Sequence, residues 1–312
     1  GWRTDFAYPE TYFHEQTHDT TDKQFSAFYN NTVITGRSGQ AGMEELDDLL
    51  DMIFATDEVT LFLCRKLYTF FVYQDINEQV EQDIIEPLAQ LLRDSNYEVK
   101  PVLETLLKSA HFFDPLNRGS MLKSPVEYVV GMNREFHVQF PPASQYQDLF
   151  ELRKAMYAHL PNMLEAIGDP PNVSGWPAWY QEPIFYKYWI TVSTYPKRAS
   201  HSDLLLFTGY ATNNQIVKPD VVAFTATLTE PADPNFLLEE VLRLFYGIEV
   251  SDEVKMQLKS ILLSGQASDY YWSSAWNEYV GDPNNVQALG VVETRLEAFY
   301  QAILQLEEYQ LL

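Results

Sequence analysis

Apolar residues from position 43 onward recur with the spacing of α-helices. Met43, Leu46, Leu49, Leu50 and Ile53 follow the i, i+3, i+4, i+7 pattern of a helix that buries one face. Similar patterns predict helices over 57–73, 80–92, 101–107, 184–195, 203–207, 220–227, 270–279 and 286–308. The 57–73 segment is hydrophobic nearly all round, which predicts a central helix. Pro87 predicts a break or kink within 80–92, whereas Pro101 suits the first turn of its helix.

Capping residues predict where several later helices begin. Ser124, Pro125 and Glu127 stand where a capping serine, a proline at the first helical position and a glutamate at the third are favoured. Ser144 and Gln147 repeat this spacing. The pair Asp233–Pro234 and Ser251 predict helices that end before Gly247 and near Gly265.

The first forty residues lack helical periodicity. Segments 27–29 and 32–35 predict a hairpin around Asn30 and Asn31, and 36–42 predicts a flexible link. That link lacks the Gly-Lys-Ser/Thr ending of a phosphate loop, so nucleotide binding is excluded. We expect a mostly α, multi-helical globular array, with helix exceeding strand several-fold and with strand mainly in the first forty residues. We expect three parts: an extended or hairpin segment at 1–42, a helical core at 43–210, and a helical subdomain at 211–312 packed on that core.

Residues 170–179, Pro-Pro-Asn-Val-Ser-Gly-Trp-Pro-Ala-Trp, predict a rigid loop. The three prolines fix φ and restrict the residues before them, and Gly175 permits a turn that a side chain would block. We expect Gly175 to allow close packing around a mostly buried Trp176 that anchors the loop. Trp179 or Tyr180 is expected to face outward.

Composition narrows the class of protein. Of the 312 residues, 46% are hydrophobic, which indicates a globular chain, and a formal net charge of −23 disfavours nucleic acid and anionic membranes as partners. The single cysteine, Cys64, excludes an internal disulfide and is expected to be buried. No apolar run approaches the roughly 18 residues of a membrane span. Because the chain opens with Gly1-Trp2-Arg3-Thr4 and no methionine, we expect a fragment whose export signal has been removed.

His14-Glu15-Gln16-Thr17-His18 has the spacing of a zinc-protease motif. On a helix the two histidines would share a face, but the threonines around them disfavour a helix, so we expect no metal and no cofactor. A zinc site at His14, Glu15 and His18 is the minor alternative. His18, Asp19 and Lys23 otherwise form either a polar site, in which the aspartate fixes the histidine tautomer, or a hairpin held by side-chain hydrogen bonds.

Later in the chain, Glu127 and Arg134 lie seven residues apart on one helix, hence on one face. Glu127 either caps its own helix or belongs to a binding site. Arg134 has two possible roles. It forms hydrogen bonds to loop carbonyls or to a carboxylate such as Asp169, or it binds an anionic group together with Lys123. The aromatic rings between 176 and 189 are either core or a surface on which sugars stack.

The order of several motifs resembles a known family. They are His18-Asp19 with Lys23, the helix containing Leu67 and Phe70-Phe71, Ser109-Ala110-His111-Phe112-Phe113, Lys123-Ser124-Pro125-Val126-Glu127 with Arg134, and Pro170-Pro171-Asn172-Val173-Ser174-Gly175-Trp176-Pro177. The chain resembles the DUF1800 family of uncharacterised bacterial proteins over roughly residues 14–210, and an extension of the resemblance over the helical remainder is left open. The resemblance implies an often exported protein, encoded beside a second exported protein that resembles sulfatases or phosphatases, and it implies no activity. Ile167-Gly168-Asp169 departs from the Gly-Gln pair expected before the double proline.

These observations favour an exported, non-catalytic helical module, in the periplasm or on the cell surface, that binds a protein partner or a glycan. The residues expected to bind are His18, Asp19, Lys123, Glu127, Arg134, Asn172, Trp176 and Trp179. The alternative is a hydrolase, either metal-dependent or built on His18 and Asp19 together with Glu127 and Arg134.

Overall fold

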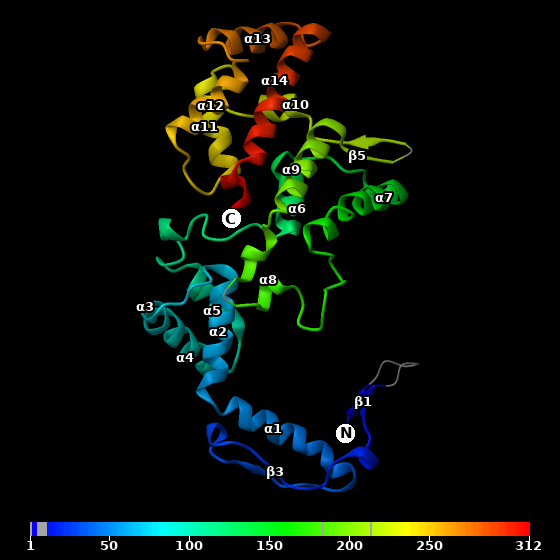
Figure 1. The fold of residues 1–312 in the computed structure, drawn as a ribbon, viewed down its shortest axis with the longest axis vertical. Coiled ribbons are helices and arrows are strands. Elements are labelled where there is room, and N and C mark those ends of the chain that lie inside the picture. Colours follow the sequence, from blue (N-terminus) through cyan, green and yellow to red (C-terminus); the bar gives the residue numbers. More distant parts are fainter. Residues whose placement is uncertain (1, 5–10, 183, 213) are drawn as a thin grey trace. The chain divides into compact units, whose positions relative to one another are not determined.

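A computed structural model describes residues 2–4, 11–182, 184–212 and 214–312. Residues 1 and 5–10 of the predicted N-terminal segment lie outside this range. The chain divides into two compact units, Gly1–Phe112 and Phe113–Leu312, and each is described by itself (Figure 1). The segment borders expected at 42 and 210 stay predictions.

The prediction of a mostly α fold is confirmed, because the described strands form only three short antiparallel pairs. The pairs are β1 (Trp2–Thr4) with β2 (Thr11–Phe13), β3 (Lys23–Gln24) with β4 (Val33–Ile34), and β5 (Tyr210–Ala211) with β6 (Ile216–Val217). Two of the three pairs lie in the first forty residues, as expected.

The hairpin predicted around Asn30 and Asn31 is present in the first unit, although its strands differ in part. Asn30 and Asn31 both adopt the left-handed conformation at the turn, where asparagine is tolerated. Residues Ala27–Tyr29, expected as a strand, form a 3₁₀ turn instead, and the strand that pairs with β4 is β3. The prediction of a flexible link at 36–42 is also wrong. It includes a 3₁₀ helix at Gly39–Met43, and a Cβ at Gly42 would lie 2.6 Å from the His18 ring.

Five helices follow in the first unit: α1 (Glu44–Phe54), α2 (Asp57–Phe71), α3 (Glu78–Val80), α4 (Glu86–Asp94) and α5 (Val99–Leu107). Helix α2 lies against α4, and α4 lies against α5, around one small core. Because these neighbours cover one side only, α2 buries Thr60, Cys64 and Tyr68 at every fourth position, while Phe62 and Phe70 are exposed. The prediction of a central α2 is therefore wrong. The burial of Cys64 is confirmed, and it raises the pKa of the thiol to about 11.

Pro87 interrupts the α-helical pattern, as predicted. A wide π turn at Glu81–Ile85 joins α3 to α4, and Pro87 stands in the first turn of α4. A proline has no N–H to donate, so it fits where the helix restarts. Pro101 likewise lies in the first turn of α5.

The second unit holds nine helices among its described residues. They are α6 (Pro125–Glu135), α7 (Tyr146–Tyr157), α8 (Pro177–Tyr180), α9 (Tyr195–Asp203), α10 (Val221–Ala226), α11 (Pro234–Phe245), α12 (Asp252–Leu262), α13 (Tyr270–Gly281) and α14 (Val286–Gln305). Helix α14 contacts α9, α10, α12 and α13, and its Leu296, Phe299 and Ile303 are fully buried. The main core of the unit therefore forms around α14.

Most capping predictions are confirmed. The Ser124 hydroxyl accepts the Glu127 N–H at 3.2 Å, and the Glu127 carboxylate accepts the Ser124 N–H at 2.7 Å. Asp233 and Ser251 cap α11 and α12. The box expected at Ser144 is wrong, because a 3₁₀ turn at Ala143–Gln145 already occupies that position and α7 begins without a side-chain cap.

The helix expected over 184–195 is mostly absent. A 3₁₀ turn at Phe185–Trp189 is followed by α9, which begins only at Tyr195. The Thr194 hydroxyl accepts the Thr191 N–H at 2.8 Å and holds the turn between them. Nor is 203–207 a separate helix, since a π turn at Leu204–Thr208 continues α9.

Candidate functional site

His14 and His18 do not share the face of an α-helix. Residues 15–17 form a single 3₁₀ turn, and both histidines have extended backbone on either side of it. The His14 ring lies 3.3 Å from the Thr17 hydroxyl through its Nδ1. Within the described part of the chain, no three His, Cys, Asp or Glu side chains are grouped so that they could hold a metal ion. The geometry of a zinc protease is therefore not formed here.

The side chains of His18 and Lys23 both contact Glu45, which was not among the predicted site residues. The Glu45 carboxylate lies 3.0 Å from His18 Nε2 and 2.6 Å from Lys23 Nζ, and it accepts the Arg37 N–H at 2.5 Å. The Asp19 carboxylate instead accepts the N–H and hydroxyl of Thr21 at 2.8 Å each. The cluster thus fastens the hairpin to the first turn of α1, and Asp19 does not orient His18.

Glu45 gives the chain an acid-sensitive contact. The hydrogen bond from Lys23, followed by those from Arg37 and His18, lowers the pKa of Glu45 to about 2. A carboxylate with a lowered pKa contributes stability above its unfolded value, near 4.5, and this contribution is lost as the pH falls toward 2.

We therefore expect Glu45→Gln to lose less unfolding free energy than the wild type between pH 5 and pH 2, measured by urea denaturation at each pH. The control is Glu44→Gln, because Glu44 is exposed on the same helix. If both variants follow the wild-type pH dependence, Glu45 is not the acid-sensitive group.

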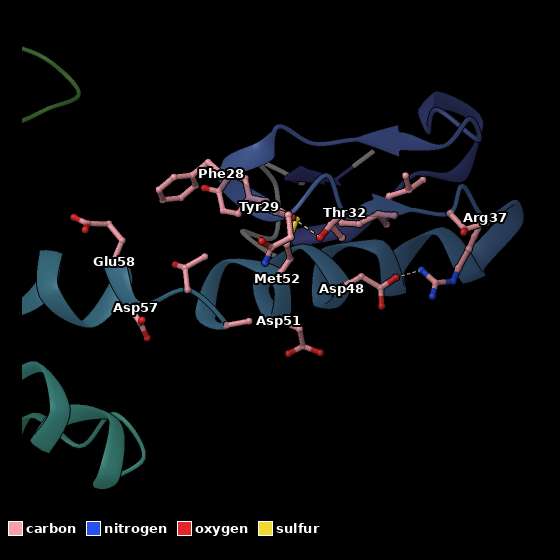
Figure 2. Close-up of a pocket in the computed structure, with 15 residues that line it drawn as sticks. Phe28, Tyr29, Thr32, Arg37, Asp48, Asp51, Met52, Asp57 and Glu58 are labelled. Carbon is pink, nitrogen blue, oxygen red and sulfur yellow. Dashed lines mark hydrogen bonds and ion pairs between the residues drawn. The ribbon is translucent and has the colours of Figure 1, made fainter.

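A cavity of about 830 Å³ lies between the β3–β4 hairpin, α1 and the start of α2. Figure 2 shows Phe28 and Tyr29 on the hairpin side and Asp48, Asp51 and Met52 on α1. Three carboxylates that line the cavity form ion pairs with arginines. Asp48 pairs with Arg37. Asp57 lies 2.6 Å from Arg93, and Glu58 lies 2.6 Å from Arg65. None of the predicted site residues lines this cavity.

Lys123 is buried in the second unit rather than presented to a ligand. Its Nζ lies over the Tyr309 ring, 3.7 Å from the centroid, and 3.9 Å from the Glu135 carboxylate. The Tyr309 hydroxyl donates to the same carboxylate at 2.5 Å. Burial lowers the pKa of Lys123 and raises the pKa of Glu135. Glu127 is likewise engaged, in the capping box of α6.

A fully buried arginine stands beside this group. Arg198 Nη2 donates to the Lys123 carbonyl at 2.7 Å, Nη1 lies 3.3 Å from the Gln310 side-chain oxygen, and the guanidinium lies 5.0 Å from the centre of the Tyr128 ring. Burial lowers its pKa to about 10, so it stays charged at neutral pH. Arg198 thus ties α9 to the start of α6 and to the 3₁₀ helix Glu307–Gln310. Arg198 and Gln310 were not among the predicted site residues, because no local sequence pattern marks them.

Arg134 lies apart from Lys123. It lines a cavity of about 450 Å³ together with His137 and Arg153, and Lys123 is not among the lining residues. Within the part of the chain that the structure describes, the Arg134 side chain forms no ion pair with Asp169 or any other carboxylate. The structure therefore does not bring Lys123 and Arg134 together.

The loop at residues 170–179, called the Pro/Trp loop below, is built around Asn172. The Gly175 N–H donates to the Asn172 carbonyl at 3.0 Å, the Ser174 N–H to its side-chain oxygen at 2.8 Å, and Asn172 Nδ2 to the Tyr180 hydroxyl at 2.8 Å. Gly175 has φ +96, which disfavours any other residue. A Cβ at this position would meet no atom within 4 Å, so the expected close packing is wrong. Gly175 is needed for the backbone conformation of the turn and not for close packing.

The buried ring of this region is Trp189, not Trp176. Trp189 is 2% exposed and packs with Ala178 and Tyr186, whereas Trp176 is half-buried against them. Trp179 is 38% exposed, as predicted, and its ring meets Trp189 edge-on at 6.2 Å. Because the 3₁₀ turn at 185–189 carries Trp189 into the core, Trp176 is left at the margin.

The fold and these sites define a mostly α-helical protein with a shaped Pro/Trp loop. Its family follows from comparison with known families, since residues 1–311 match the model described as "Protein of unknown function (DUF1800)". The chain belongs to this family. Comparison with curated proteins and with solved structures found no match. No helix among the described residues is both long and apolar enough to cross a bilayer.

Proposed function

We propose that this protein is an exported, non-catalytic binding module, and that residues 164–192 present its binding surface to a protein partner. The observation that carries the proposal is a set of six exposed apolar side chains in this segment, which includes the two most exposed large apolar side chains of the described residues. We call them the loop surface: Leu164, Ile167, Val173, Trp179, Ile184 and Val192. Val173 and Val192 are almost fully exposed, at 107% and 97%. Exposed apolar side chains that form one patch are typical of interaction sites, and we propose that these six form one.

The chemistry of the loop surface favours a protein over a glycan. Sugars stack on flat aromatic faces, but Trp179 is the one tryptophan of the loop surface, and the other five side chains are aliphatic. Aliphatic side chains suit the apolar core of a protein interface. The partner that we propose is the second exported protein implied by the family resemblance, which resembles sulfatases or phosphatases.

The partners of the charged and titratable residues that were predicted as site residues support a binding role over a catalytic one. His18 and Lys23 are bound to Glu45, Glu127 caps α6, and Lys123 is enclosed by Tyr309 and Glu135. Each of these groups has a structural partner, which a general acid or base would have to exchange for a substrate.

The test is the affinity of the purified chain for that partner, measured by biolayer interferometry. We expect the double variant Val173→Ser/Val192→Ser to weaken binding at least about tenfold, because each buried valine contributes on the order of 1–2 kcal/mol. Its thermal stability should stay unchanged, since both side chains are exposed.

The matched control is Val286→Ser, a valine 81% exposed at the start of α14. No binding by the wild type, or an equal loss in the control, would contradict the proposal. Binding to a glycan array that depends on Trp179 would favour the glycan instead.

A further inference from the structure

The cavity beside Arg134 is cationic in a strongly acidic chain. It lies between the last turn of α6, the 137–140 turn and α7, and two arginines, Arg134 and Arg153, line it together with His137. No aspartate or glutamate is among its lining residues. The chain as a whole has 44 acidic and 21 basic residues, so a pocket with this charge is opposite to the general trend.

Both arginines are exposed, and neither has a partner among the residues that the structure describes. Of the residues that the structure describes, none forms an ion pair or hydrogen bond with the guanidinium of Arg134 or Arg153. Their neighbour Lys154, by contrast, lies 3.5 Å from Glu151. Two uncompensated guanidinium groups at one cavity attract an anion, which accepts charge-assisted hydrogen bonds from them.

The turn at the end of α6 adds a further group at the same place. The Val138 N–H donates to the Asn133 carbonyl at 2.9 Å, and the His137 N–H to the Arg134 carbonyl at 3.0 Å, which closes the helix. This closure puts His137 at φ 52, where glycine is the usual residue. A histidine here brings a ring to the cavity at a cost in backbone strain.

The remaining lining fixes the kind of anion. Val130, Val138, Phe140 and Met156 give the cavity an apolar wall, and its volume of about 450 Å³ is in the range of small-molecule sites. The C-terminal end of α6 carries partial negative charge, which disfavours any anion there, and disfavours a dianion such as phosphate more than a monocarboxylate. A guanidinium binds both carboxylates and phosphates in a bidentate way, so the apolar wall and the helix end are what favour an organic carboxylate.

We infer that this cavity binds a small organic monocarboxylate with an apolar face, and that Arg134, Arg153 and His137 hold its carboxylate. This site is separate from the loop surface and does not depend on the proposed function.

The test is a ligand-observed NMR titration of the full chain with benzoate, cyclohexanecarboxylate, benzyl alcohol and inorganic phosphate. We expect at least one of the two carboxylates to saturate a site, with benzyl alcohol and phosphate binding at least about tenfold more weakly. Arg134→Gln and Arg153→Gln should each weaken carboxylate binding about tenfold or more, while Lys154→Gln should leave it unchanged.

The variant His137→Gly tests the backbone strain at this position and the role of the His137 ring in carboxylate binding separately. Glycine adopts the left-handed conformation without strain, so this variant should melt at a higher temperature and yet bind the carboxylate more weakly. The inference is overturned if neither carboxylate saturates, if phosphate or benzyl alcohol binds as well, or if Lys154→Gln loses as much affinity as the arginine variants.

Discussion

Replacing Trp189 with alanine is expected to lower the free energy of unfolding by about 3–5 kcal/mol, as truncations of large buried aromatic residues do. The ring is 2% exposed and packs with Ala178 and Tyr186, so its loss leaves a cavity under the Pro/Trp loop. Urea denaturation of the full chain measures the effect.

Two neighbouring tryptophans serve as controls. Trp176→Ala should cost about 1–2 kcal/mol because Trp176 is half-buried, and Trp179→Ala should cost less because Trp179 is exposed. A larger loss for Trp176 than for Trp189 would show that the loop is anchored at Trp176 after all.

Arg198→Ala is expected to cost about 3–5 kcal/mol, because it truncates a large, fully buried side chain and removes its hydrogen bonds. The change opens a cavity and leaves the Lys123 carbonyl and the Gln310 side-chain oxygen without a buried donor. Arg198→Met keeps most of the volume and removes the charge, so it should cost only about 1–2 kcal/mol.

The control for Arg198 is Lys197→Ala, at the adjacent exposed position, which should change stability by no more than about 0.5 kcal/mol. Chemical denaturation of the three variants beside the wild type gives the order. If Arg198→Met proves as damaging as Arg198→Ala, the charge itself rather than the packing stabilises this region.

The features that the sequence predicted best are those that depend on near neighbours. The Ser124 capping box, the caps at Asp233 and Ser251, and most of the periodic helices involve residues within a few positions, and these were found. The helix expected over 184–195 is the main exception. The mostly α fold follows from them. The box at Ser144 was wrong for an equally local reason, since the 3₁₀ turn before α7 was not recognised.

The features that the sequence could not predict depend on distant partners. Glu45 lies 27 positions from His18, and Gln310 lies 112 positions from Arg198, and no local pattern links either pair. The same limit applies to burial: periodicity marks α2 as apolar, but only the packing of α4 shows which side is covered. Choosing Trp189 over Trp176 as the buried ring needs the turn at 185–189, which the aromatic composition concealed.

Residues 119–123 form backbone hydrogen bonds with residues 310–312, so this part of the fold can form only after residues 310–312 have been synthesised. The Gly119 N–H donates to the Leu312 carbonyl, and the Lys123 N–H to the Gln310 carbonyl, each at 2.7 Å. Ribosomes add about 5–20 residues per second, so the first segment waits roughly ten to forty seconds for the second to be synthesised. During that interval the edge of the backbone beside α6 is unpaired and open to chaperones or to a neighbouring nascent chain.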